Sequence, residues 1–272
     1  MKRILFGVAL ASVVGAMCWD IPARGEPFDS SFRSNLLGSE RMSVAPEAQS
    51  AADALTKLEQ AAEAQPDDLR PGNDYRMAVI QAADRAGSPA GALAQYDRAL
   101  AFYQKLVTAH GSSANAHLNY GFAYVDKIPA AGSITQVILA NNALGEFTKS
   151  LDLQSSWIGL YTRGNSYLFW PRIFNRTHLG VADLEAALKL QRADKKRSYH
   201  VRVFVALGDG YWKMGDVAKA TAIWKEGLAE FPDHAALKAR LSKQGDELKA
   251  LIDTVYDSSK RVDTSLKDLW TE

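Results

Sequence analysis

From about residue 46 onward, apolar residues recur at the three- and four-residue spacing of amphipathic helices, and Gly, Pro, Asn or Asp separates one such stretch from the next. No stretch alternates apolar and polar residues as a half-buried strand does. The pattern therefore predicts an all-α chain. We expect helices at about 46–64, 74–86, 89–109, 114–125, 135–153, 156–169, 181–190, 199–214, 216–230 and 233–256, and a short amphipathic stretch at 266–270.

The clearest repeat unit spans residues 201–234. Gly208 and Ala220 are small where two antiparallel helices have to approach closely, and Pro232 cannot continue the second helix. Large residues that would fill the seam stand at fixed distances from them. The motif reads Phe204-x2-Leu207-Gly208-x2-Tyr211, then Ala220-x3-Trp224, and closes with Phe231-Pro232. It resembles the tetratricopeptide repeat (TPR), a helix–turn–helix unit of about 34 residues.

Weaker copies of this unit precede it. They lie at 157–191 and 114–154 with longer turns, at 54–66 as the second half of a unit, and at 74–110 as a degenerate helix pair. The resemblance implies a TPR-like superhelical solenoid of antiparallel helix hairpins, because such units bury their apolar faces only by stacking on one another. A repeat domain is therefore expected over residues 47–257, with a C-terminal capping helix at 233–256 and a C-terminal tail at 258–272.

Residues 1–25 are predicted to be a secretory signal peptide. Lys2 and Arg3 precede an apolar run over residues 4–16 that is too short to span a bilayer as a stable helix, and small residues follow it. Residues 26–46 are rich in Ser, Gly and Pro without a sustained period, and we expect them to form a flexible leader. The signal predicts an exported protein, either periplasmic or lipid-anchored at an envelope membrane.

Cys18 is the only cysteine in the sequence. It stands just after the apolar run, where a bacterial lipoprotein carries its lipidated cysteine, and the preceding Gly15-Ala16-Met17 resembles a lipobox weakly. Cys18 is therefore either a lipidation site or a residue that is removed with an ordinary signal peptide. Under both interpretations the folded part has no cysteine, which excludes disulfides, CxxC redox motifs and thiolate metal sites.

Composition and motifs argue against several classes of function. Hydrophobic residues make up 47% of the chain and charged residues 23%, which is enough for a core with a soluble surface. The net charge of +1 argues against a general binder of nucleic acid or anionic membranes. The five histidines are scattered without metal-ligand spacing, and no nucleophile elbow, phosphate loop or dinucleotide fingerprint is present. We predict no catalytic site, no metal and no cofactor.

The TPR resemblance implies a groove that is lined by the first helix of each unit and that binds a protein or peptide. Large aromatic residues beside Arg or Lys are typical of interface hot spots. Ordinary packing between units would equally explain Phe122, Phe169 and Trp212. The residues carried over to groove positions are Asn115, Leu118, Phe122, Tyr161, Asn165, Phe169, Arg202, Asp209, Trp212 and Lys213.

The stretch over residues 157–179 is unusual because six aromatic side chains interleave with Arg163, Arg172 and Arg176. Trp170-Pro171 ends its helix, so residues 172–178 are expected to form an extended turn at the edge of the solenoid. Two interpretations stay open: the turn contacts a partner, or it fills the gap that the longer turn creates.

Two functions fit these observations. The first is a non-catalytic, exported adaptor or envelope assembly factor with a protein or peptide partner in the cell envelope, as the resemblance to bacterial TPR proteins implies. The alternative is a small-molecule binding module, such as a transporter accessory, in which the longer turns close over the groove.

Overall fold

The computed structural model describes residues 46–257 and 260–271, with only the backbone described for residues 46–51. The predicted signal peptide at 1–25, Cys18, and the predicted leader up to residue 45 lie outside the described residues. The described part contains eleven α helices and no strand. They are α1 (Pro46–Ala64), α2 (Leu69–Asp84), α3 (Pro89–Ala109), α4 (Ala114–Lys127), α5 (Ser133–Leu153), α6 (Trp157–Leu168), α7 (Thr177–Arg192), α8 (Val201–Lys213), α9 (Val217–Glu230), α10 (Ala235–Leu241) and α11 (Gly245–Val255).

Short 3-10 helices follow or join several of these elements: η2 (Ile128–Ala130), η3 (Arg172–Phe174), η4 (Ser198–His200) and η5 (Lys267–Leu269). Most of the helices begin and end within a few residues of the positions predicted from the sequence. Two differ. Helix α2 begins earlier because the Asp68 side chain accepts a hydrogen bond from the backbone N–H of Arg70 at 2.9 Å. Pro71 is tolerated in the first turn, where its missing N–H is not needed.

The second difference concerns the capping helix predicted at 233–256. The chain forms two helices there, α10 and α11, with residues 242–244 between them. Gly245 has a φ of +51°, a left-handed conformation that other residues rarely adopt, and it redirects the chain into α11. Leu237 of α10 and Ile252 of α11 are fully buried, so the two helices together still cover the last hairpin.

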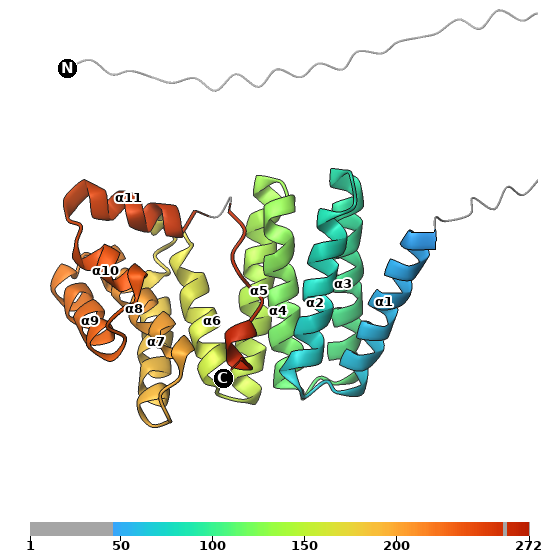
Figure 1. The fold of residues 1–272 in the computed structure, drawn as a ribbon, viewed down its shortest axis with the longest axis horizontal. Coiled ribbons are helices and arrows are strands. Elements are labelled where there is room, and N and C mark those ends of the chain that lie inside the picture. The colour runs from blue at the N-terminus through green and yellow to red at the C-terminus, as the bar shows by residue number, and fades with distance from the viewer. Residues whose placement is uncertain (1–45, 258–259, 272) are drawn as a thin grey trace, which may run out of the picture. The chain divides into compact units, whose positions relative to one another are not determined.

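Consecutive helices lie side by side in chain order (Figure 1). Helix α4 packs on α5, α6 on α7, and α8 on α9, so the chain is a TPR-like solenoid of antiparallel helix hairpins as the repeats predicted. The first helices of successive units also touch, since α2 contacts α4 and α6 contacts α8. These first helices form one face, which is the groove face.

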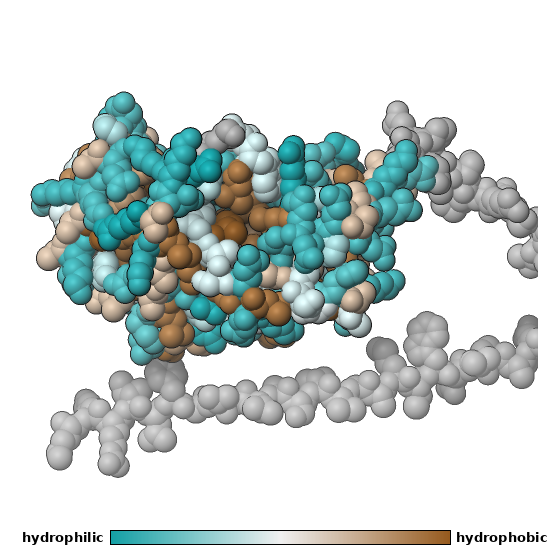
Figure 2. Space-filling model, turned by 90° about the horizontal axis from the view of Figure 1, so that it is seen from below, coloured by the Kyte–Doolittle hydropathy of each residue, from teal (hydrophilic) through white to brown (hydrophobic). Residues whose placement is uncertain are grey.

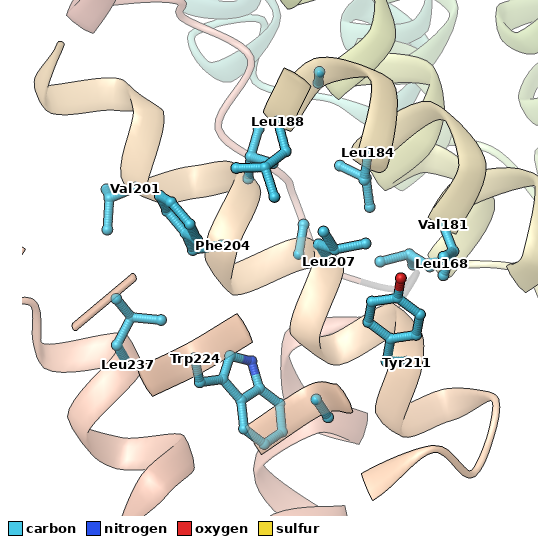
Figure 3. Close-up of a cluster of buried hydrophobic side chains, with 14 of the residues drawn as sticks. Leu168, Val181, Leu184, Leu188, Val201, Phe204, Leu207, Tyr211, Trp224 and Leu237 are labelled. Atoms are coloured by element: carbon cyan, nitrogen blue, oxygen red, sulfur yellow. The ribbon is translucent and has the colours of Figure 1, made fainter. Parts of the chain in front are cut away.

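The seam between α8 and α9 confirms the physical basis of the repeat pattern. Trp224 of α9 is 1% exposed and lies over Gly208 of α8, where an added β carbon would overlap its indole ring. Phe204, Leu207 and Leu237 pack around it, as Figure 3 shows. In the hairpin of α4 and α5, Gly121 makes the same close approach to the ring of Phe147.

The core divides into three clusters. One lies on α1 to α4, a second on α6 to α11, and a small third cluster joins α4 and α5 to Leu266. Apolar residues also reach the surface between the more hydrophilic ends: in the view from below they gather near the middle of the face (Figure 2). No helix in the described ranges is long and apolar enough to cross a membrane.

The C-terminal segment (residues 260–271) returns to the groove face, in front of α4 to α6 in Figure 1. Arg261 pairs with Asp84 of α2 at 3.0 Å, and Thr264 donates a hydrogen bond to Asp126 of α4 at 2.5 Å. Further along, Asp268 pairs with Arg202 of α8. The segment predicted as a tail therefore crosses the first helices of several units.

Candidate binding site

A pocket of about 260 Å³ opens between α4, η2, α5, α6 and the C-terminal segment. Its wall is mainly apolar, and a few polar groups stand on the α6 and α8 sides. The apolar lining includes Phe122, Val125, Val137, Phe169, Trp170 and Leu266. The polar lining includes Tyr161, Asn165 and Arg202. A mostly apolar concavity with a few polar groups is the usual composition of a binding site.

Five of the ten residues predicted to meet a partner line this pocket. Tyr161, Asn165 and Phe169 are spaced four residues apart, so helical geometry places them on one face of α6 and its C-terminal end. Phe122 reaches the pocket from α4, and Arg202 from α8. The structure thus brings together residues from three first helices, as expected for a groove.

Tyr161 is held in place by its neighbours. Its ring stacks on that of Trp157, with centroids 5.3 Å apart and an interplanar angle of 10°. Burial raises the pKa of Tyr161, and the nearby Arg202 opposes that shift. The phenol therefore stays protonated at neutral pH and can donate a hydrogen bond to a ligand in the pocket.

Leu118 and Asp209 are buried while the C-terminal segment and the capping helices are in place, so their prediction as exposed contact residues is wrong. Leu118 is 0% exposed and belongs to the third core cluster, beneath Leu266 of the C-terminal segment. Asp209 is also 0% exposed and is held by Arg240 and Tyr256. The resemblance gave the helix face correctly but not the later elements that cover it.

The remaining three predicted residues lie away from the pocket. Asn115 donates a hydrogen bond to the carbonyl of Asp67 at 2.7 Å and ties α4 to the turn after α1. Trp212 packs against the second core cluster. Lys213 donates to the carbonyl of Leu168 and lies 4.5 Å from the centre of the Tyr256 ring, and its burial lowers its pKa. These contacts hold helices together.

Beside the pocket, the groove floor carries a buried polar network that the sequence analysis missed. Arg76 of α2 is 1% exposed and lies 4.7 Å from the centre of the Phe122 ring. Its guanidinium donates to Asp126 at 2.8 Å, to Asn73 at 2.9 Å and to Asn119 at 3.2 Å. Burial raises the pKa of Asp126, against the opposing effect of Arg76. No spacing in the sequence signals this network, because its members come from two separate helices, α2 and α4.

The pocket has an exposed apolar rim. We define the rim as the exposed apolar residues of the two elements that contribute to this side of the pocket, α5 and η3: Ile134, Val137, Ile138, Ile173 and Phe174. Val137 and Phe174 also line the pocket itself. The two elements are tied together because Arg176 donates to Asn141 of α5 at 3.0 Å.

One part of the turn after α6 fills space, as the second interpretation predicted, and another part stays exposed. Trp170 is buried, with Arg176 lying 3.8 Å from the centre of its ring and Phe174 packed edge-on against it. This part of the turn fills the space beside α6. Ile173, by contrast, is 86% exposed and contributes nothing to that packing, so it is free to contact a partner.

Within residues 46–257 and 260–271 there is no group of three or more His, Cys, Asp or Glu side chains suited to a metal ion. No known protein-family model matches the sequence, and no curated protein matches it. Among solved structures, the chain is similar to TTC0263, a thermophilic TPR protein of Thermus thermophilus. The two are 19% identical with a TM-score of 0.49, over 72% of this chain and 91% of that one.

Proposed function

We propose that this protein is a non-catalytic, exported repeat protein that binds a protein partner in the cell envelope, as an adaptor or an assembly factor. The observation that carries the proposal is the apolar pocket on the groove face together with its exposed rim. A TPR-like solenoid supplies the scaffold, and the rim supplies apolar surface that the fold itself leaves open.

The rim is costly to expose unless something covers it. Ile134 and Ile173 are 82% and 86% exposed, and Phe174 is 49% exposed. Single apolar residues are common on protein surfaces, but several on two elements that also line an apolar pocket, through Val137 and Phe174, favour an interaction site. A partner that inserts one large apolar side chain into the pocket and covers the rim would bury both.

Replacing Ile134, Ile173 and Phe174 together with serine is expected to abolish capture of the partner. These side chains are exposed, so melting should stay nearly unchanged. Loss of interface anchors should weaken binding by about 2 kcal/mol or more. The measurement compares proteins that the wild-type and variant chains retain from envelope extract, quantified by mass spectrometry, with thermal melting of each chain.

A matched control uses three exposed apolar residues far from the pocket. Serine at Leu190, Met214 and Val217, which are 40%, 51% and 54% exposed, removes three exposed apolar side chains from α7, from the turn after α8 and from the start of α9. This control should retain the partner. If both variants lose the partner equally, capture reflects nonspecific hydrophobic binding. If both retain it, the interface lies elsewhere.

The alternative function is binding of a small apolar molecule, as in a transporter accessory. The observation in its favour is that the C-terminal segment covers part of the pocket, with Thr264 and Leu266 among the lining residues. Native mass spectrometry of the purified chain discriminates the two functions. A retained small ligand that disappears after Phe169→Ala favours the small-molecule function.

Export supplies a separate prediction. The signal over residues 1–25 should be removed, so the mature protein is expected to lack at least Met1 to Met17. Intact-mass measurement of the protein from its native cell distinguishes an acylated N-terminal Cys18 from a start at Glu26. Full-length chain recovered from the cytoplasm would argue against both.

A further inference from the structure

The C-terminal segment lies on the groove as a bound peptide would. Of its side chains only Thr264 and Leu266 are buried, at 5% and 7% exposure, and the others stay partly or fully open to solvent. Two buried anchors separated by one residue, with solvated flanks, are the pattern of an extended segment seated in a groove.

Thr264 completes the polar network of the groove floor. Its backbone carbonyl accepts a hydrogen bond from the Arg76 guanidinium at 2.9 Å, and its hydroxyl donates to Asp126 at 2.5 Å. The groove therefore offers one donor to a main-chain carbonyl and one acceptor for a hydroxyl at a fixed position. Arg76 and Asp126 also pair with each other at 2.8 Å, so the segment adds the last two hydrogen bonds to a network that is already charge-paired.

Leu266 supplies the apolar anchor and is held in a strained backbone. It packs with Leu118, Phe122 and Phe147 in the third core cluster. Its φ is +52°, in the left-handed region that a leucine rarely adopts. Strain of this kind is typical of ligand clamps and switch regions, because bound contacts have to hold the residue there.

The flanking ion pairs of the segment lie at the surface. Arg261 pairs with Asp84 at 3.0 Å, and Asp268 pairs with Arg202, in both cases between partly or fully exposed side chains. Exposed pairs of this kind contribute little to affinity. The buried anchors of the segment are Thr264 and Leu266, and the partly buried Leu269 and Trp270 add apolar contact with the third core cluster.

We propose that the C-terminal segment is an intramolecular ligand that occupies the groove until a partner displaces it. The partner presents an extended segment of the same chemistry, with a Ser or Thr hydroxyl two residues before a leucine-like side chain. This inference rests on the proposed function and adds to it the chemistry of the partner and the control of access. Tethering gives the chain's own segment a high local concentration, so only a tighter-binding partner replaces it.

The test uses the whole chain and a fluorescently labelled synthetic peptide of residues 260–271. One variant carries Thr264→Ala with Leu266→Ala, which removes both anchors of the resident segment. Its matched control carries Lys267→Ala with Thr271→Ala, two exposed positions of the same segment. Peptide binding is measured by anisotropy, amide exchange follows residues 260–271, and melting shows whether each chain is folded.

In the anchorless variant we expect cooperative melting, faster exchange over residues 260–271, and peptide binding about a hundredfold tighter than in the wild-type chain. The control variant should behave like wild type. A labelled peptide that carries the same two alanines should fail to bind any of the chains, because it lacks the groups that Arg76, Asp126 and the third core cluster recognise.

Three results would overturn the proposal. If the anchorless chain folds and releases its segment but does not bind the peptide, the groove has no peptide site. A chain that loses cooperative melting shows that the segment is a permanent part of the core. Unchanged exchange over residues 260–271 shows that Thr264 and Leu266 are not its anchors.

The outcome can be separated from that of the proposed function. Thr264 bonds to Arg76 and Asp126, and Leu266 belongs to the third core cluster, which contains no rim residue, so serine at Ile134, Ile173 and Phe174 should leave peptide binding by the anchorless chain intact. If the peptide does not bind but partner capture still depends on the rim, the proposed function holds and the intramolecular ligand does not. If the peptide binds but partner capture no longer depends on the rim, the rim is not part of the binding site.

Discussion

Gly208→Ala is expected to destabilise the protein, whereas the same substitution at Gly145 is expected to stabilise it. Both glycines lie inside helices, α8 and α5. A β carbon at Gly208 would overlap the indole of Trp224, which is 1% exposed and cannot move aside. Nothing lies within 4 Å of a β carbon at Gly145. The sign of the effect therefore depends on helix packing, since the change in helix propensity is the same.

The expected loss at Gly208 is about 1–3 kcal/mol, as for other overpacked cores, and leucine should cost more. At Gly145 alanine should gain about 0.5–1 kcal/mol through its higher helix propensity. Each kcal/mol corresponds to a shift of about 2–4 °C in melting temperature for a domain of this size. If Gly208→Ala melted at or above wild type, α8 and α9 would not cross at this glycine, and the repeat assignment of residues 201–234 would fail.

The hairpins could be predicted from the sequence because their determinants are local. Gly208 and Trp224 are 16 positions apart in the printed sequence, and the hairpins of α4 with α5 and of α6 with α7 repeat the pairing as Gly121 with Phe147 and Gly164 with Leu184. The C-terminal segment could not be predicted in this way. Its contact between Thr264 and Arg76 joins residues 188 positions apart, and it follows no periodic pattern. Extended segments carry little signal in their own sequence, because their partners specify them.

The candidate site could also be predicted only in part. The resemblance assigned Tyr161, Asn165 and Phe169 to groove positions, and these three residues line the pocket from one face of α6. The exposed fraction of each site residue could not be predicted, because it depends on which later elements cover its helix. Asp209 lies on the corresponding helix of the last unit, where α10 and α11 bring Arg240 and Tyr256 over it. Because these two side chains cover it, Asp209 is a core residue and not the contact residue that was predicted.

Asp209→Ala is accordingly expected to destabilise the fold by about 3–5 kcal/mol, as when one partner of a buried ion pair is removed. Asp209 accepts hydrogen bonds from Arg240 at 2.5 Å and 2.6 Å and from the Tyr256 hydroxyl at 3.1 Å. Its side chain is 0% exposed and that of Arg240 is 3% exposed. Without the carboxylate, the Arg240 charge stays buried with only the carbonyl of Ala236 to accept from it.

Two further variants separate the charge effect from the loss of packing. Asp253→Ala breaks the exposed pair with Lys249 on α11 and should change stability by less than about 1 kcal/mol. Asp209→Leu combined with Arg240→Leu removes both charges and should recover most of the loss, since apolar replacements of a buried pair are often tolerated. Chemical denaturation of the three chains measures these differences. If the double variant were as unstable as Asp209→Ala, the hydrogen bond from Tyr256 and the shape of the pair, not the stranded charge, would hold α8 to the two capping helices.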